Sequence, residues 1–145
     1  MMQITGVTYP IPKQYIERFF TDRKNVFIKP ATTFKQLKSG MNFVFYQSRE
    51  DTGFVGEARI KNILYDEDPH NFFQIYNDRI FLTYQEVNEY IEHKKKWKFS
   101  VRKAKNPKKT IWMAIELEQI KKYPAIQKPP QFIPVGGKYL TEEVN

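Results

Sequence analysis

The sequence predicts an α+β domain built around a small, partly closed antiparallel β-barrel with two or three short flanking helices. Three observations support this fold class. Apolar residues recur with a helical period in some segments and alternate in others. The alternating segments are short and rich in aromatic and β-branched residues, without an internal repeat. The chain of 145 residues, 41% of them hydrophobic, is long enough for one core, so residues 1–145 are expected to form a single domain.

The first forty residues are expected to contain a helix, a strand and a second, shorter helix. Pro12 suits the first turn of a helix whose apolar face consists of Tyr15, Ile16, Phe19 and Phe20. A strand-like run over residues 26–28 ends at Pro30, which cannot donate to a strand ladder. Residues 33–40 carry a weak capping box and a terminal glycine, which predict one or two helical turns.

An antiparallel pair of strands is expected next. Residues 41–47 (MNFVFYQ) are almost entirely aromatic or β-branched, and residues 54–61 alternate between apolar and polar side chains. The polar segment 48–53 joins them as a turn. Gly56 and Ala58 would lie on the inner face of the second strand, and their small size suggests that another element passes close over that face.

Two helix starts are visible in the middle of the chain. Residues 66–69 (DEDP) place three acidic side chains where they interact favourably with a helix dipole. Thr83 and Glu86 form a good capping box, and the following apolar residues at helical spacing are Tyr84, Val87 and Ile91. These patterns predict two further helices.

The last third of the chain is expected to consist of strands. Residues 97–102 alternate between the apolar side chains of Trp97, Phe99 and Val101 and polar or cationic ones. Residues 111–120 form a second strand, whose inward side chains would be Ile111, Met113, Ile115 and Leu117. Within residues 132–140, Gly136-Gly137 is a plausible hairpin turn between two short strands.

Composition excludes several classes of protein. The absence of cysteine excludes disulfide scaffolds, thiolate metal sites and a cysteine nucleophile, and it is compatible with a reducing compartment. No apolar run approaches the roughly 18 residues of a transmembrane helix, and the first residues do not resemble a signal peptide. We therefore expect a soluble, cytoplasmic protein.

Sequence motifs give no sign of a cofactor or metal. No glycine-rich nucleotide loop, metalloprotease helix or serine-nucleophile motif is present. His70 and His93 lack a partner at metal-ligand spacing and are interpreted as surface residues. Residues 66–68 could hold a hard cation, but no second ligand cluster follows, so they are interpreted as a solvated helix start.

The clearest functional signal is a basic segment over residues 93–109. The chain has 24 basic and 16 acidic residues, and nine of the basic ones lie in this segment, which contains no acid. Without it the chain would hold 15 basic and 16 acidic residues and be nearly neutral. Lysines and arginines neutralise phosphates, and aromatic rings stack on bases. The segment therefore favours a polyanion partner, with RNA as the expected one, over a solvated loop. The candidate contact residues are Lys94, Lys95, Lys96, Trp97, Lys98, Arg102, Lys103, Lys105, Lys108 and Lys109.

A second candidate site is a polar rim around the predicted hairpin. A lysine at a strand end and a Ser-Arg-Glu turn could bond a base edge or a phosphate, although ordinary turn chemistry explains them equally well. The residues of this rim are Lys29, Tyr46, Ser48, Arg49, Glu50, Glu57 and Arg59.

Residues 23–63 resemble the ASCH branch of the PUA-like superfamily. The resemblance rests on a basic residue near the first strand, a short helix ending in Lys38-Ser39-Gly40, a further strand and turn, and the strand Gly56-Glu57-Ala58. Most of the chain is also similar to a family of small archaeal proteins of unknown function. The matching features are Gly6-Val7 with Pro10-Ile11-Pro12, Lys29-Pro30-Ala31-Thr32, Phe45-Tyr46-Gln47-Ser48-Arg49-Glu50, Phe81-Leu82-Thr83 and Gly137-Lys138-Tyr139.

The resemblance implies a PUA-like barrel with a cleft that receives RNA or an extruded nucleobase. Some ASCH proteins look like amidohydrolases that act on acylated cytidine with a lysine, a threonine and a glutamate. Lys24 matches that lysine, but Asn25 and Phe27 replace the two threonines of the motif. We therefore expect an RNA-binding module. The alternatives are a small hydrolase acting on an acylated nucleoside, with Lys24 or Lys29 as base and Glu57 as proton carrier, and an adaptor for an acidic protein partner.

Overall fold

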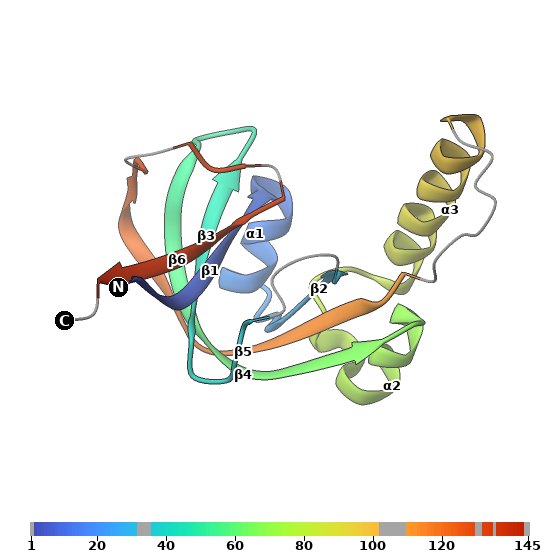
Figure 1. Ribbon diagram of the computed structural model, residues 1–145, viewed down its shortest axis with the longest axis horizontal. Coiled ribbons are helices and arrows are strands. Elements are labelled where there is room, and N and C mark those ends of the chain that lie inside the picture. The colour runs from blue at the N-terminus through green and yellow to red at the C-terminus, as the bar shows by residue number, and fades with distance from the viewer. Residues whose placement is uncertain (1, 32–35, 102–109, 130–131, 135, 144–145) are drawn as a thin grey trace.

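The computed structural model describes residues 2–31, 36–101, 110–129, 132–134 and 136–143, and of residues 94–101 it describes the backbone alone (Figure 1). The strands are β1 (Met2–Pro12), β2 (Val26–Pro30), β3 (Asn42–Ser48), β4 (Gly53–Asp66), β5 (Trp112–Gln127) and β6 (Lys138–Glu143). The helices are α1 (Lys13–Phe20), α2 (Phe72–Tyr76) and α3 (Tyr84–Val101), and two 3₁₀ turns, η1 (Pro69–Asn71) and η2 (Asn77–Arg79), flank α2.

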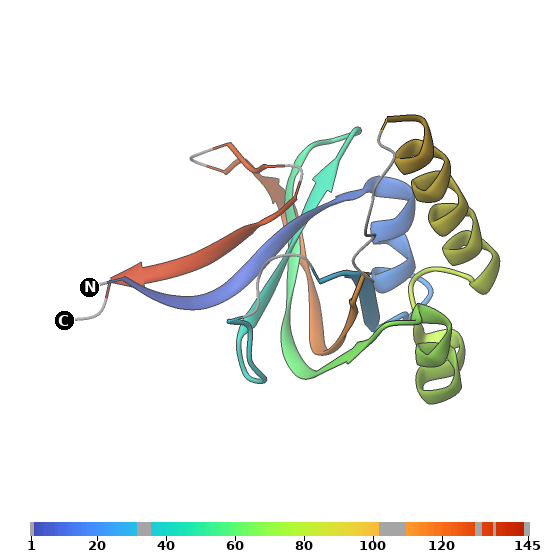
Figure 2. The ribbon, with the colours of Figure 1, turned by 45° about the vertical axis from the view of Figure 1, so that its right-hand side comes forward.

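All six strands belong to one curved sheet with the order β2-β5-β4-β3-β1-β6. Every neighbouring pair is antiparallel except β1 and β3, which run parallel. The sheet is not closed into a barrel, because β2 does not pair with β1. Bulges in the long pair β4–β5 let the sheet curl far enough to bring β2 and β1 opposite each other (Figure 2). We call this unpaired junction between β1 and β2 the seam.

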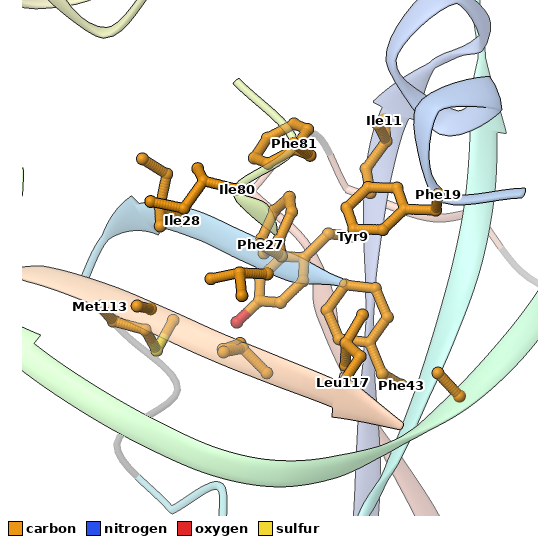
Figure 3. Close-up of a cluster of buried hydrophobic side chains, with 14 of the residues drawn as sticks. Tyr9, Ile11, Phe19, Phe27, Ile28, Phe43, Ile80, Phe81, Met113 and Leu117 are labelled. Atoms are coloured by element: carbon orange, nitrogen blue, oxygen red, sulfur yellow. The ribbon is translucent and has the colours of Figure 1, made fainter. Parts of the chain in front are cut away.

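Aromatic packing fills the seam. The ring of Tyr9 on β1 stacks on Phe27 of β2 at 5.2 Å between centroids, and Phe27 stacks on Phe81 at 5.0 Å (Figure 3). Phe81 in turn stacks on Phe19 of α1 at 5.3 Å. All four side chains are buried. The two strand edges are therefore held together by rings and not by main-chain hydrogen bonds.

Most elements predicted from the sequence are confirmed. The helix after Pro12 is α1, with its predicted apolar face buried or packed against the core. The antiparallel pair is β3–β4, and a Cβ at Gly56 would lie 2.5 Å from Cζ of Phe20, so α1 does pass close over the inner face. In the capping box of α3, the backbone N–H of Thr83 donates to Glu86 Oε1 at 2.8 Å and that of Glu86 donates to Thr83 Oγ1 at 3.1 Å.

The strand predicted over residues 97–102 is wrong for residues 97–101, because these residues belong to α3, which continues to Val101. The alternation spans only a few residues, and lysine favours helices. Adding residues to a helix that is already nucleated at Thr83 is also much easier than starting a new element. The first part of the basic segment, residues 93–101, thus forms the last turns of α3. The remainder, with Arg102, Lys103, Lys105, Lys108 and Lys109, lies outside the described residues.

Three other strand predictions need correction. The first residues form β1, which pairs along one edge with β3 and along the other with β6, although its prolines carry no strand signal. Ile111 is 47% exposed and precedes β5, whose residues 112–117 are buried on both faces. Gly137 does sit in a turn, at φ 95°, but only β6 follows it, and residues 132–134 are not a strand. Of the helix predicted for 33–40, residues 33–35 lie outside the described residues, and residues 36–40 form turns and irregular chain instead of a helix.

A charged network ties the start of β2, the turn η2 and β5 together. The buried carboxylate of Glu116 accepts a 2.6 Å bond from Arg79 Nη2, and Lys61 Nζ lies 3.8 Å away. Arg79 Nε also donates to Asn25 Oδ1 at 3.0 Å. Arg79 therefore supplies the hydrogen-bonded partner of this buried carboxylate, and Lys61 is a second, more distant cation.

We expect Arg79→Met to lower the free energy of unfolding by about 1–3 kcal/mol, because it leaves the Glu116 carboxylate poorly paired. Urea unfolding of the purified variant measures this loss. The double variant Arg79→Met/Glu116→Gln should recover part of it, since the buried charge is then absent. A double variant as unstable as the sum of its single changes would contradict this explanation.

Candidate functional site

A cavity of about 580 Å³ opens at the seam, between β1, β2 and α3. Its position follows from the length of β6, which pairs with β1 only as far as Thr8. From Tyr9 to Pro12 this edge of β1 has no neighbouring strand and faces residues 27–30 of β2. The aromatic cluster fills the inner part of the seam, and the cavity occupies the outer part.

One face of α3 forms the far wall of the cavity. Glu86, Glu89, Tyr90 and His93 all line it, and their spacing of three, four and seven residues places them on one side of a helix. Arg18 of α1 holds this helix in place, because its two guanidinium nitrogens bond the two carboxylate oxygens of Glu86 at 2.6 and 3.0 Å. The same guanidinium donates to the carbonyl of Phe81 at 2.9 Å.

The negative charge of Glu86 positions α3 against α1 through its ion pair with Arg18. The hydrogen bond from Arg18 lowers the pKa of the Glu86 carboxyl, and the backbone N–H of Thr83 lowers it further. Glu86 is therefore ionised and already bonded on both oxygens. It fixes the angle at which α3 leaves the domain, and Glu89, one turn further along, is the carboxylate better placed for a ligand.

Lys29 is the cation on the β2 side of the cavity. Its Nζ lies 4.3 Å from the centroid of the Tyr9 ring and 3.4 Å from the carbonyl oxygen of Gly136. Burial lowers the pKa of the Lys29 ammonium, and burial likewise raises the pKa of the Tyr9 phenol. An ammonium in apolar surroundings is a strong hydrogen-bond donor for an acceptor that enters the cavity.

Aromatic rings provide flat surfaces at the rim. Trp112, at the start of β5, packs edge-to-face on Tyr90 of α3 at 5.4 Å. Tyr15 packs edge-to-face on Phe81 at 6.3 Å, and both line the cavity. Together with the apolar side chains of Ile11, Ile28 and Leu82, these rings suit a planar ligand that carries a few polar groups.

The residues on either side of the nine basic side chains, His93 and Trp112, both lie at this cavity. Residues 94–109 connect them through Thr110 and Ile111. The chain thus leaves the cavity wall along α3 and returns to it at β5 (Figure 1). The sequence by itself gave no reason to place His93, where the basic segment begins, at the same cavity as Lys29.

The predicted polar rim is divided between two surfaces. Lys29 lines the cavity, whereas Tyr46, Ser48, Arg49, Glu57 and Arg59 do not. In β3 the buried residues are Phe43, Phe45 and Gln47, so Tyr46 and Ser48 point to the outer face of the β3–β4 hairpin. Tyr46 packs there on Phe54, and Arg49 lies in the turn with φ 73°. The strands β5 and β4 separate β2 from β3 in the sheet, which is why residues close in sequence are not together.

The residues of the hydrolase alternative are not brought together either. The Nζ of Lys24 donates to the carbonyl of Asp78 outside the cavity. Glu57 lies on the hairpin, opposite Val44 and Lys121. Burial raises the pKa of the Tyr123 phenol, and the charge of the nearby Glu57 carboxylate raises it further. Of that proposed set only Lys29 lines the cavity.

Several cavity residues were missed from the sequence. Tyr9 lies in a strand that was not predicted, and His93 was interpreted as an isolated surface residue. The helical spacing of Glu86, Glu89, Tyr90 and His93 could have revealed the α3 wall, had the helix been extended past the capping box. Among the described residues, no three His, Asp or Glu side chains are grouped to hold a metal ion. No helix in the described part of the chain is long and apolar enough to cross a membrane.

The lowered pKa of Lys29 predicts a pH-dependent stability. The folded protein bears the cost of burying the ammonium at neutral pH, and this cost disappears as pH rises from the folded-state pKa to the unfolded value of about 10.4. Wild-type stability should therefore increase with pH relative to Lys29→Met in the window that ends near pH 10.4. Urea unfolding of both proteins at several pH values measures the difference, and a difference that stays constant would contradict the burial of this charge.

Comparison with known proteins agrees with the predicted resemblance. A serine-to-alanine mutant of the ASCH protein from Zymomonas mobilis superposes with a TM-score of 0.73 at 14% identity, over 97% of this chain and 91% of that one. The tyrosine-to-phenylalanine mutant of the same protein superposes with a TM-score of 0.66 at 11% identity, over 94% and 90%. These similarities show the PUA-like fold.

A sequence relative is archaeal. The uncharacterized protein MJECS03 of Methanocaldococcus jannaschii is 43% identical over 104 residues, which are 71% of this chain and 92% of the relative. The model of the family described as "Domain of unknown function (DUF365)" matches residues 4–142. The chain therefore belongs to the DUF365 family and carries its conserved region on an ASCH-like fold.

Proposed function

We propose that the protein is an RNA-binding module that takes a base or nucleotide into the seam cavity and holds the adjoining phosphates with its basic segment. The observation that carries this proposal is the position of His93 and Trp112. Both line the cavity, and they flank the nine basic residues that account for the net charge of the chain. In this proposal the cavity supplies the stacking surface, and the chain between His93 and Trp112 supplies the counter-charge.

The composition of the cavity suits a base better than a phosphate. Its lining includes one lysine and two glutamates, of which Glu86 is already bonded to Arg18. A phosphate would meet little net positive charge there, whereas a planar heterocycle would find aromatic surfaces and both a cation and a carboxylate at its edges. The cations that phosphates require lie in the basic segment.

The fold supports the same proposal. In PUA-like proteins a cleft over the barrel commonly receives RNA or an extruded base, and the seam cavity is the candidate for such a cleft in this chain. The outer hairpin residues Tyr46, Ser48, Arg49, Glu57 and Arg59 remain predicted as a second contact surface for the same strand of RNA. Because they lie away from the cavity, they would affect affinity without affecting which base is selected.

Replacing Lys94, Lys95, Lys96 and Lys98 by Gln should flatten the dependence of RNA affinity on salt. Each phosphate contact on a single strand contributes a log–log slope of about −0.7, so the variant should lose up to about 2.8 of it. Fluorescence anisotropy with a labelled single-stranded RNA at several salt concentrations measures the slope. The control carries the same charge change at Lys38, Lys121, Lys122 and Lys128. Equal slopes for the two variants would reject the basic segment as the phosphate contact.

The variant Tyr90→Ala should weaken RNA binding by about 1–3 kcal/mol and leave the salt slope unchanged, because it removes a stacking surface and no charge. The same anisotropy titration measures both quantities. Tyr65→Ala is the matched control, since Tyr65 is about half exposed and lies on β4 outside the cavity. An equal loss in both variants would point away from the cavity.

A further inference from the structure

The main-chain groups of β2 divide into two sets. The backbone N–H of Ala31 donates to the carbonyl of Ile111 at 2.7 Å, and that of Leu117 donates to the carbonyl of Asn25 at 2.7 Å. In the β2–β5 register these bonds assign the odd-numbered residues of β2 to the hydrogen-bonded pairs. The N–H and C=O groups of the even-numbered residues therefore point away from β5.

Two observations confirm this assignment. The carbonyl of Val26 accepts a 3.0 Å bond from the backbone N–H of Phe81, on the side of β2 away from β5. Pro30, which has no N–H, occupies an even position, and proline is tolerated in a strand where its missing donor would face away from the partner. Between these two residues lies Ile28.

The register directs the N–H and C=O of Ile28 away from β5, toward the side of β2 on which the seam lies. Ile28 lines that cavity and is only 2% exposed. Within the described part of the chain, β2 pairs with no strand but β5, and no other residue bonds these two groups. Buried backbone donors and acceptors are nearly always paired in folded proteins. An open pair at the wall of a cavity lined with aromatic rings therefore indicates a ligand that completes it.

We propose that the N–H and C=O of Ile28 read the Watson–Crick edge of an unpaired base, an assignment that rests on the RNA-binding function proposed above. The two groups of one extended residue point in the same direction, as a neighbouring donor and acceptor. Each of the four bases presents a neighbouring donor and acceptor on its Watson–Crick edge, which is free only when the base is unpaired. The small exposed area of Ile28 suits the thin edge of an inserted ring. The ligand class is thus a single-stranded or extruded nucleotide.

A panel of short single-stranded RNAs tests this assignment. Oligouridine is compared with the same length of N3-methyluridine, whose methyl group blocks the Watson–Crick edge, and of 5-methyluridine, whose methyl group lies away from it. We expect N3-methylation to weaken binding about tenfold or more, and 5-methylation to leave it nearly unchanged, with equal salt slopes. Oligoguanosine and its N1-methylated form should show the same loss.

The outcomes separate this inference from the function on which it rests. Equal binding of uridine and N3-methyluridine strands would overturn the Ile28 assignment and leave RNA binding intact. An absence of binding by every strand at low salt would overturn the RNA-binding function itself.

A protein variant provides the second measurement. Ile28→Pro removes the N–H that points away from β5 but no bond to β5, and Ile28→Val removes comparable side-chain bulk while keeping the N–H. Only Ile28→Pro should reduce the ratio between uridine and N3-methyluridine affinity, and the salt slope of both variants should stay as in the wild type. An unchanged ratio in a folded Ile28→Pro protein would overturn the assignment. If Ile28→Pro does not fold, the RNA panel with the wild-type protein decides.

Discussion

The packing of Tyr9 on Phe27 determines how the rest of the domain is arranged. These rings join two strand edges that share no main-chain hydrogen bonds, and Phe81 and Phe19 extend the stack to the helices (Figure 3). Each aromatic pair adds about 0.5–1.5 kcal/mol beyond the burial of its area. Because rings and not a ladder close the seam, the sheet keeps an opening where a cavity can form. A fully paired barrel would have no free main-chain groups at that position.

The arrangement separates affinity from selectivity. The net charge of the chain lies in residues 93–109, and a charge attraction of that kind acts on any polyanion. In the proposed function, the aromatic faces of the cavity, together with Lys29, Glu89 and the main-chain groups of Ile28, would distinguish one planar ligand from another. The two are joined at His93 and Trp112, so a strand held by the basic segment would present its bases at the cavity. The Arg18–Glu86 ion pair maintains this geometry by fixing the base of α3.

Sequence patterns correctly predicted the elements that are held together by residues close in sequence. The hairpin β3–β4 follows from period-two alternation around a polar turn, and the start of α3 follows from the Thr83–Glu86 capping box. The strand prediction at 97–101 failed because five alternating residues also fit the end of a lysine-rich helix, where continuation from an existing turn decides the outcome. The strand β1 was missed because its prolines suppress a strand signal, while its position between β3 and β6 comes from partners distant in sequence.

The sequence by itself determined the fold class, the single basic segment and the candidacy of Lys29, since composition, period and charge are readable without partners. Only the tertiary structure decided which residues meet. It placed β5 between Lys29 and Glu57, and both β5 and β4 between Lys29 and Tyr46. It also brought Tyr9, Tyr90 and Trp112 to the same cavity as Lys29. The physical reason is that the order of strands in a sheet depends on long-range pairing. Within the described residues, the N–H and C=O of Ile28 lack a strand partner because β2 pairs only with β5.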